Sequence, residues 1–177
     1  RDVNIAFANE LSIICDRAGI NPKALIDLAN HHPRVNILWP GAGVGGHCIA
    51  VDPWFVVAMD PENAKLIRLA RETNDSKAEW TRTRISEAAD KFESEHGRPA
   101  KIAALGLAFK PNIDDIRESP ALAITGSLLA KGYDVLPVEP NMKDHETLKL
   151  VDQERASREA DILAFLVGHD AFSGLDT

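Results

Sequence analysis

The chain has 177 residues, 45% of them hydrophobic and 27% charged, which suffices for one large or two small globular domains with a real core. The net charge of −7 argues against nucleic acid as a partner, and no apolar run approaches the roughly eighteen residues of a membrane helix. Two cysteines, Cys15 and Cys48, exclude a disulfide framework and a zinc quartet, and they fit a cytosolic protein with one working thiol.

Two helices are predicted at the start of the chain. Residues 1 to about 19 have apolar residues at helical spacing and end at Gly19, and Cys15 belongs to the apolar stripe, which favours a core position. Asn21-Pro22 has an N-cap residue followed by a proline suited to the first helical position, so a second helix is expected to about Asn30.

The glycine-rich stretch Gly41 to Pro53 is the most informative part of the sequence. Four glycines lie within six residues, and they let the backbone turn through positive φ and run close to a ligand. One helical turn after them would place Cys48 and Asp52 on the same face. A thiol, a carboxylate and bare backbone in one small volume suit covalent chemistry on a small molecule.

The glycine stretch has two other interpretations. Gly41-x-Gly43-x-x-Gly46 matches a dinucleotide-binding pattern, but that pattern needs a strand before it and a long helix after it. Trp39-Pro40 precedes it, and Pro53 is expected to close the segment after one short turn, so this interpretation is rejected. An inert buried cysteine beside a glycine loop remains the simpler alternative, because free cysteine often behaves as a small hydrophobe.

A long helical pattern runs from Pro61-Glu62 to about His96, with a break expected near residues 73–75. A helix of this length usually packs against other helices or a partner subunit. We therefore expect a homodimer formed through residues 1–19 and about 62–96. Residues 97–99 read as a turn and as the domain boundary, which gives a helical domain at 1–97 and a second domain at 98–177.

The second domain reads as strand, helix, strand, helix, strand. The expected strands are 101–106, 133–138 and 162–167, and the expected helices are 119–131, with Ser119-Pro120 as its cap, and 155–160. This alternation predicts an α/β fold with a parallel, doubly wound sheet, whose ligands bind at the carboxyl ends of the strands. Both ends of the chain look interrupted, so we expect a fragment with an incomplete second domain.

The segment after the first strand, residues 107–119, carries Lys110 and Arg117. These are the cations that an anionic ligand would need against the negative net charge. The simpler alternative is a solvated polar loop.

Taken together, these motifs resemble the nucleotide-sugar dehydrogenases, which oxidise a UDP-sugar twice to a uronic acid with NAD. The resemblance spans most of the chain, in the family's order. The Gly-Gly-His-Cys form followed by Asp-Pro is typical of members that act on N-acetylated sugars. The segments that carry the resemblance are 4–10, 32–34, 41–53 and 108–120.

The resemblance also implies roles for individual residues. Cys48 would be the nucleophile, and Asp52 is placed to orient or activate water. Arg117 would reach the NAD phosphates. His32 and Arg34 are expected to reach into the partner's site. The residues expected to touch the UDP-sugar are Arg1, His32, Arg34, Gly45, Phe109 and Lys110.

In this family an N-terminal NAD domain precedes a dimerisation domain and a UDP-binding domain, and the chain resembles only the last two, the last one incompletely. The family's catalytic lysine and asparagine would precede Arg1. No metal is expected. The alternatives kept open are a dehydrogenase for another UDP-N-acetylhexosamine and a non-catalytic dimeric module that binds nucleotide sugars.

Overall fold

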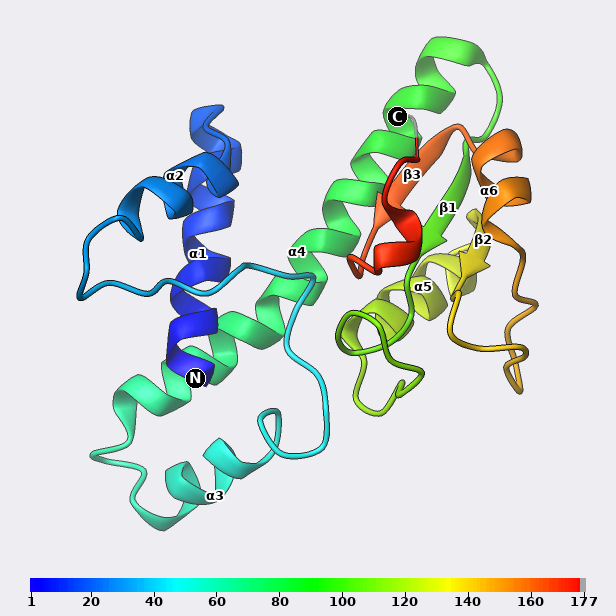
Figure 1. Cartoon of the computed structure of the whole chain (residues 1–177). Coiled ribbons are helices and arrows are strands. Elements are labelled where there is room, and N and C mark those ends of the chain that lie inside the picture. The colour runs from blue at the N-terminus through cyan, green and yellow to red at the C-terminus, as the bar shows by residue number, and fades with distance from the viewer. Residues whose placement is uncertain (176–177) are drawn as a thin grey trace. The chain divides into compact units, whose positions relative to one another are not determined.

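The computed structural model describes residues 1–175, which form two compact units by their internal contacts, residues 1–77 and the described residues from 78 to 175. Figure 1 shows the helical first unit and the sheet of the second. The elements, in chain order, are α1 Asp2–Ala18, α2 Pro22–Ala29, α3 Asp52–Met59, α4 Lys65–His96, β1 Lys101–Leu105, α5 Pro120–Ala130, β2 Asp134–Val138, α6 Gln153–Glu159, β3 Ile162–Phe165 and the 3-10 helix η1 Asp170–Phe172.

The first two helices are confirmed with their predicted caps. Gly19 ends α1 at φ 66°, a left-handed conformation that glycine adopts without strain. The Asn21 side chain accepts hydrogen bonds from the backbone N–H groups of Lys23 and Ala24, so it caps α2. Cys15 is buried, as its place on the apolar stripe predicts.

Two predictions about the helices are wrong. Pro53 does not close a short turn; it lies in the first turn of the eight-residue helix α3, where its missing N–H leaves no bond unmade. The long helix α4 starts at Lys65 and not at residue 61 or 62, because Asp60 accepts from the Asn63 N–H and holds residues 60–63 in a turn.

The expected break near residues 73–75 is also absent, since α4 runs unbroken for 32 residues. Nδ2 of Asn74 donates to Oδ1 of Asp2 at 2.8 Å, and Asp75 accepts from Arg71 one turn earlier. These side chains therefore do not compete for their own backbone, which is the usual reason that Asn and Asp weaken helices.

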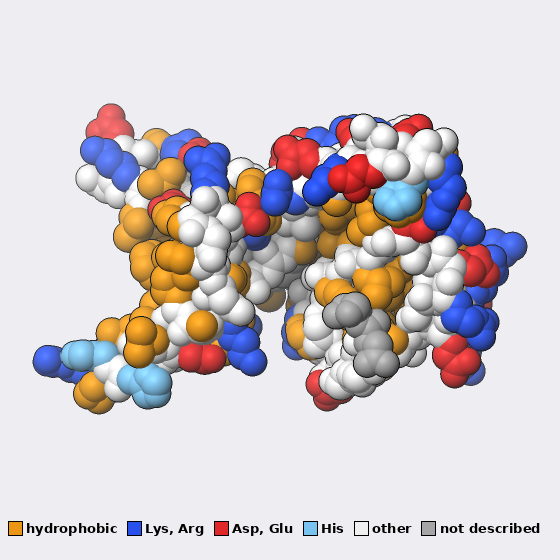
Figure 2. Space-filling view, turned by 90° about the horizontal axis from the view of Figure 1, so that it is seen from above, with side chains coloured by type: hydrophobic (Ala, Val, Ile, Leu, Met, Phe, Trp, Pro, Cys, Tyr) orange, Lys and Arg blue, Asp and Glu red, His pale blue; other side chains and the backbone are white. Residues whose placement is uncertain are grey.

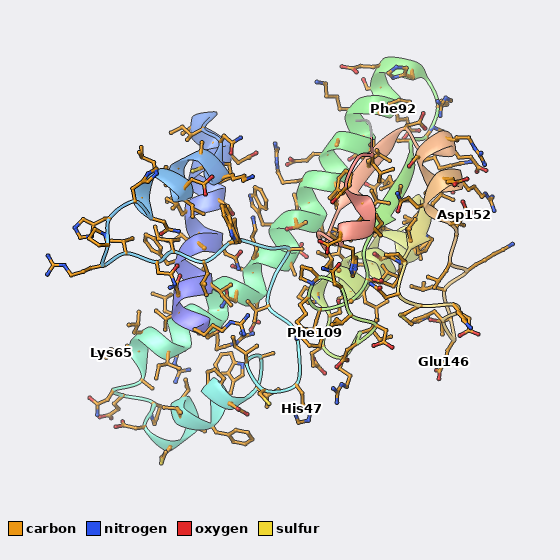
Figure 3. All side chains as sticks on the ribbon, viewed as in Figure 1. His47, Lys65, Phe92, Phe109, Glu146 and Asp152 are labelled. Atoms are coloured by element: carbon orange, nitrogen blue, oxygen red, sulfur yellow. The ribbon has the colours of Figure 1, made fainter. Side chains whose placement is uncertain are left out.

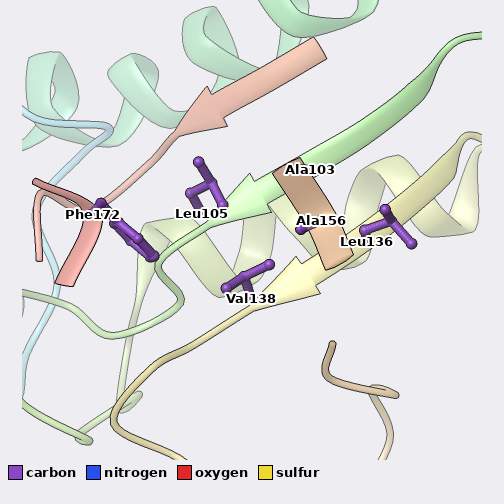
Figure 4. Packing of buried hydrophobic residues seen from close by; sticks show 6 residues of the cluster. All are labelled: Ala103, Leu105, Leu136, Val138, Ala156 and Phe172. Atoms are coloured by element: carbon purple, nitrogen blue, oxygen red, sulfur yellow. The ribbon is translucent and has the colours of Figure 1, made fainter. Parts of the chain in front are cut away.

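The second unit contains a parallel three-stranded sheet in the order β2-β1-β3, which confirms the predicted α/β fold. From β1 the chain crosses to β2 on one side of it, and from β2 it crosses to β3 on the other side. Because such crossovers are right-handed, α5 and α6 lie on opposite faces of the sheet. The residues of one core cluster are Ala103, Leu105, Leu136, Val138, Ala156 and Phe172 (Figure 4).

By contacts, residues 78–96 of α4 count with the sheet unit. The predicted turn at residues 97–99 follows directly, with Gly97 at φ 69°. The domain boundary between residues 97 and 98 stays a prediction.

Candidate functional site

Cys48 lies on an exposed turn that leads directly into α3. The backbone N–H of Asp52 donates to the Cys48 carbonyl at 2.8 Å, which closes one helical turn and puts the two residues on the same side of it. Cys48 is exposed and forms no disulfide. Its Sγ lies 3.9 Å from Nδ1 of His47, whose exposed ring is labelled in Figure 3. The predicted helical turn between Cys48 and Asp52 is therefore present, and the convergence of their side chains on one ligand stays a prediction.

The glycine loop before Cys48 has its own backbone requirements. Gly43 and Gly46 have φ values of 149° and 96°, which side-chain-bearing residues rarely adopt. Gly45 and Gly46 are buried, although His47 and Cys48, which follow them, are exposed. Residues 35–41 are irregular and form no strand, so the dinucleotide pattern lacks the strand it needs.

Asparagine side chains hold the irregular segment that leads to the loop. Asn4 accepts from the Leu38 N–H at 2.9 Å, and Asn30 exchanges two hydrogen bonds with the backbone of Ile37. Asn9, which is fully buried, accepts from the Gly41 N–H at 2.9 Å. Side-chain amides thus replace the hydrogen bonds that a strand would have supplied.

A buried polar network supports both ends of the loop from beneath. Asn9 donates to Oδ1 of Asn74 at 2.9 Å, and Asn74 donates to Asp2. Arg71 pairs with Asp2 at 2.8 Å, and its Nη1 also lies 3.5 Å from the Ile49 carbonyl. The network connects Gly41 at the start of the loop with Ile49 beside the thiol, through residues of α1 and α4.

The other residues predicted in this unit are accessible. His32 and Arg34 are exposed on the turn after α2, where the Arg34 N–H donates to Nδ1 of His32. Arg1 is exposed at the start of α1, and its side chain makes no capping bond. Each is open to an anionic ligand or a second chain.

In the second unit, Phe109 and Lys110 stand at the carboxyl end of β1, as predicted. Phe109 is half-buried, Lys110 is exposed, and Nζ of Lys110 lies 5.7 Å from the Phe109 ring centre. Cations at this distance from a ring face are attracted to it. An aromatic plane beside a cation suits a nucleotide, which offers a base and phosphates.

Arg117 is paired within the same segment. Its guanidinium donates to both carboxylate oxygens of Asp115, and this hydrogen bonding lowers the pKa of that carboxyl to about 2. The Arg117 side chain is 67% exposed, so it is accessible to a phosphate while it keeps this bidentate pair.

Sequence reasoning missed a buried pair at the carboxyl edge of this sheet, Glu139 and His169, whose side chains are both inaccessible to solvent. A usable signal was present, because each follows closely on a predicted buried strand. Within residues 1–175 no group of three or more His, Cys, Asp or Glu residues could hold a metal ion. No helix among the described residues is long and apolar enough to span a membrane.

Known proteins match almost the whole chain. A family model described as the UDP-glucose/GDP-mannose dehydrogenase family, central domain, matches residues 1–76, and the UDP binding domain model of the same family matches residues 103–177. An NDP-N-acetyl-D-galactosaminuronic acid dehydrogenase from Ralstonia solanacearum is 53% identical over 100% of this chain and 42% of its own length.

A UDP-N-acetyl-D-mannosamine dehydrogenase from Salmonella typhi is likewise 53% identical, over 99% of this chain and 44% of the relative. The solved structure of a UDP-N-acetyl-mannosamine dehydrogenase from S. aureus superposes with a TM-score of 0.84 at 40% identity, covering 99% of this chain and 41% of that one. The chain thus spans less than half the length of each of these proteins.

Proposed function

We propose that this chain, which belongs to the UDP-glucose/GDP-mannose dehydrogenase family, forms the dimerising and UDP-sugar-binding part of an NAD-dependent dehydrogenase that oxidises UDP-N-acetyl-D-mannosamine to its uronic acid. The observation that carries this proposal is the exposed Cys48 thiol, one helical turn before Asp52 and two residues after the buried glycine pair. Two free cysteines, one of them buried, support a cytosolic protein.

Cys48 is the nucleophile in this proposal. The first oxidation converts the primary alcohol of the sugar into an aldehyde, and the Cys48 thiolate adds to its carbonyl carbon to give a thiohemiacetal. Loss of a hydride from the carbon and of the hydroxyl proton converts the thiohemiacetal into a thioester. Water then attacks the thioester, releases the carboxylic acid and restores the thiol. Asp52, on the same side of the turn, orients that water and takes its proton.

Arg117 fits a phosphate of NAD, because its guanidinium is accessible and presents fixed donors. Bound NAD⁺ would accept the hydride in each of the two oxidations. Lys110 and Phe109 would hold the UDP-sugar, Lys110 at a phosphate by charge. Arg1, His32, Arg34 and Gly45 complete the proposed substrate contacts, with His32 and Arg34 reaching a partner's site.

The N-acetylated sugar is favoured by the Gly-Gly-His-Cys sequence at the thiol and by the names of the similar dehydrogenases. These relatives carry names of two different N-acetylhexosamine derivatives at equal identity. Another UDP-N-acetylhexosamine, such as UDP-N-acetylglucosamine, is therefore the alternative substrate. A non-catalytic dimeric module that binds nucleotide sugars is the alternative from another class.

A second copy of the chain is the proposed partner of the helical unit. Val3, Phe7 and Ile14 are exposed large apolar residues of α1, and their spacing puts them on one face. Leu66 and Leu69 of α4 are also exposed. Figure 2 shows hydrophobic side chains gathered on this unit. Several exposed large apolar side chains on one unit are typical of a protein interface, which supports the homodimer.

Two measurements test the function. Calorimetry with UDP on residues 1–177 asks whether the chain binds the nucleotide. Assays of the whole protein with UDP-N-acetylmannosamine, its gluco and galacto isomers and NAD⁺ ask which sugar is oxidised, with two NADH expected per acid formed. UDP binding without turnover of any of these sugars by the whole protein would favour the non-catalytic module.

A further inference from the structure

The carboxyl ends of the three strands meet around two buried polar side chains. Glu139 directly follows β2, and His169 follows β3 by four residues, while β1 lies between these strands. Nε2 of His169 and Oε2 of Glu139 are 3.1 Å apart, and both side chains have no solvent exposure. A buried carboxylate is costly unless its oxygens are hydrogen-bonded. Its presence in so small a core calls for a reason.

The Glu139 carboxylate accepts hydrogen bonds from the loop after β1 and from Asn141. Its Oε2 accepts from the N–H groups of Leu107 at 2.7 Å and Ala108 at 3.0 Å. Its Oε1 accepts from the backbone and side-chain amides of Asn141 at 3.1 and 3.3 Å. Both oxygens are satisfied, and the carboxylate fixes the point at which the chain leaves β1.

The surroundings of His169 determine its tautomer. The backbone N–H of Asn112 points at Nδ1 from 2.9 Å, and a backbone N–H can only donate. Nδ1 therefore carries no proton, and the ring donates from Nε2 to Glu139. The amide of Asn141 also lies 3.1 Å from Nδ1. His169 is thus a fixed link from Glu139 to Asn112.

The five residues 108–112, here called the arch, are held at both ends by Glu139 and His169. Glu139 accepts from the N–H of Ala108 at one end, and His169 accepts from the N–H of Asn112 at the other. Asn112 has a positive φ of 61°. Oδ1 of Asn112 accepts from the Asp170 N–H at 2.9 Å, which adds a second bond there. Phe109 and Lys110 lie between these two ends.

Gly106 lets His169 come close enough to β1 to reach the Asn112 N–H. It has φ 88°, and a Cβ on it would lie 2.6 Å from Cβ of Val167 and 3.1 Å from Cδ2 of His169. A side chain at position 106 would push the segment containing His169 away from β1.

We propose that Glu139 and His169 are positioning residues for the UDP-binding arch, which they hold so that Phe109 and Lys110 are preorganised for the base and phosphates. Preorganised side chains bind more tightly because less freedom is lost on binding. This inference rests on the proposed function, since it assumes that the arch binds UDP.

The test is calorimetric titration of residues 1–177 with UDP. His169→Leu removes the donor and the acceptor together and should weaken UDP binding about tenfold or more. His169→Gln keeps an amide donor and a carbonyl acceptor, so it should recover most of the affinity. His96→Gln is the matched control: His96 lies before β1, at the amino edge of the sheet, and should leave UDP affinity unchanged.

A double-mutant cycle separates positioning from general stability. Lys110→Ala should weaken UDP binding strongly in the wild-type background and only slightly in His169→Leu, because the arch is already displaced there. If His169→Leu does not fold, Glu139→Asp serves the cycle, since its shorter carboxylate cannot reach both the Ala108 N–H and His169. The Asn112 amide resonance reports the displacement independently.

The outcomes are distinct. Absence of UDP binding by the wild-type chain would refute the proposed function of the arch itself. The positioning role would be overturned if His169→Leu or Glu139→Asp bound UDP with the affinity of the wild-type chain although the Asn112 resonance had shifted. Full additivity of Lys110→Ala with either variant would overturn it as well.

Discussion

Nη1 of Arg71 donates to Oδ1 of Asp2 across 2.8 Å, which joins α4 to the first residue of α1 inside the helical unit. The Arg71 side chain is only 2% exposed. The same guanidinium nitrogen lies near the carbonyl of Ile49, the residue after Cys48. A buried ion pair therefore lies close to the backbone of the residue that follows the proposed nucleophile.

Replacing Arg71 should destabilise the chain. Arg71→Met should lower the free energy of unfolding by about 3–5 kcal/mol, because Asp2 would stay buried without its opposite charge. Urea unfolding measures the change. The control is Arg84→Met in the same helix, whose half-exposed pair with Glu87 should be worth less than about 1 kcal/mol. Equal losses in the two variants would show that the Asp2–Arg71 pair contributes nothing beyond a surface pair.

Cys48 should be the reactive cysteine. In the native chain, iodoacetamide should modify exposed Cys48 and leave buried Cys15 intact, as mass spectrometry of tryptic peptides would show. In the whole protein, Cys48→Ser should stop acid formation, because a hydroxyl is a far weaker nucleophile near neutral pH. The control Cys15→Ala should retain turnover. Normal acid production by Cys48→Ser would remove the thiol from the mechanism.

Lys110 and Arg117 should serve different ligands. Lys110→Ala should weaken UDP binding and Arg117→Ala should mainly raise the KM for NAD⁺, each by roughly ten- to a hundredfold, since a charge-assisted bond to phosphate is worth about 1.5–3 kcal/mol. Calorimetry with UDP and steady-state kinetics of the whole protein measure these effects. The control is Lys131→Ala, because exposed Lys131 lies between α5 and β2, at the amino edge of the sheet. If Lys110→Ala left the UDP affinity unchanged and Arg117→Ala left the KM for NAD⁺ unchanged, both cations would be solvated surface charges.

The chain should be a dimer through α1 and α4. Phe7→Glu and Ile14→Glu each place a charge on the exposed apolar face of α1 and should shift light scattering toward the monomer mass. Met59→Glu changes an exposed apolar residue of α3 and should leave the mass unchanged. A wild-type monomer at micromolar concentration would contradict the proposal.

Acid should weaken the sheet unit through Asp161. Arg98 donates to both oxygens of this carboxylate, and the Lys101 N–H adds a third bond, which lowers the pKa of Asp161 to about 2 from an ordinary 3.8. Because the folded-state pKa is depressed, the stabilisation is complete above about pH 4 and is lost as the pH falls toward 2.

Asp161→Asn and Arg98→Gln should both flatten the dependence of the unfolding midpoint on pH between about 4 and 2. Thermal unfolding at a series of pH values measures this. An unchanged slope in both variants would show that other groups govern the acid transition.

Local sequence was a good guide wherever the determining contacts are local. Gly19, Asn21-Pro22 and Ser119-Pro120 mark helix ends because a cap is made by residues one to four positions away. The three strands were likewise readable from short apolar runs between turn residues. The single turn joining Cys48 to Asp52 followed from spacing alone.

Contacts between distant residues decided the rest. Asn74 and Asp75 favour a helix break by their residue types. In the structure Asn74 donates to Asp2 of α1, which lies 72 positions earlier in the chain, and the helix continues. His169 and Glu139 are 30 positions apart, and only the β2-β1-β3 order brings them together beneath the arch. The sequence by itself determined the capped helix ends, the three strands and the turn from Cys48 to Asp52. The tertiary structure alone decided which buried polar groups satisfy one another, because that depends on pairings which no local pattern encodes.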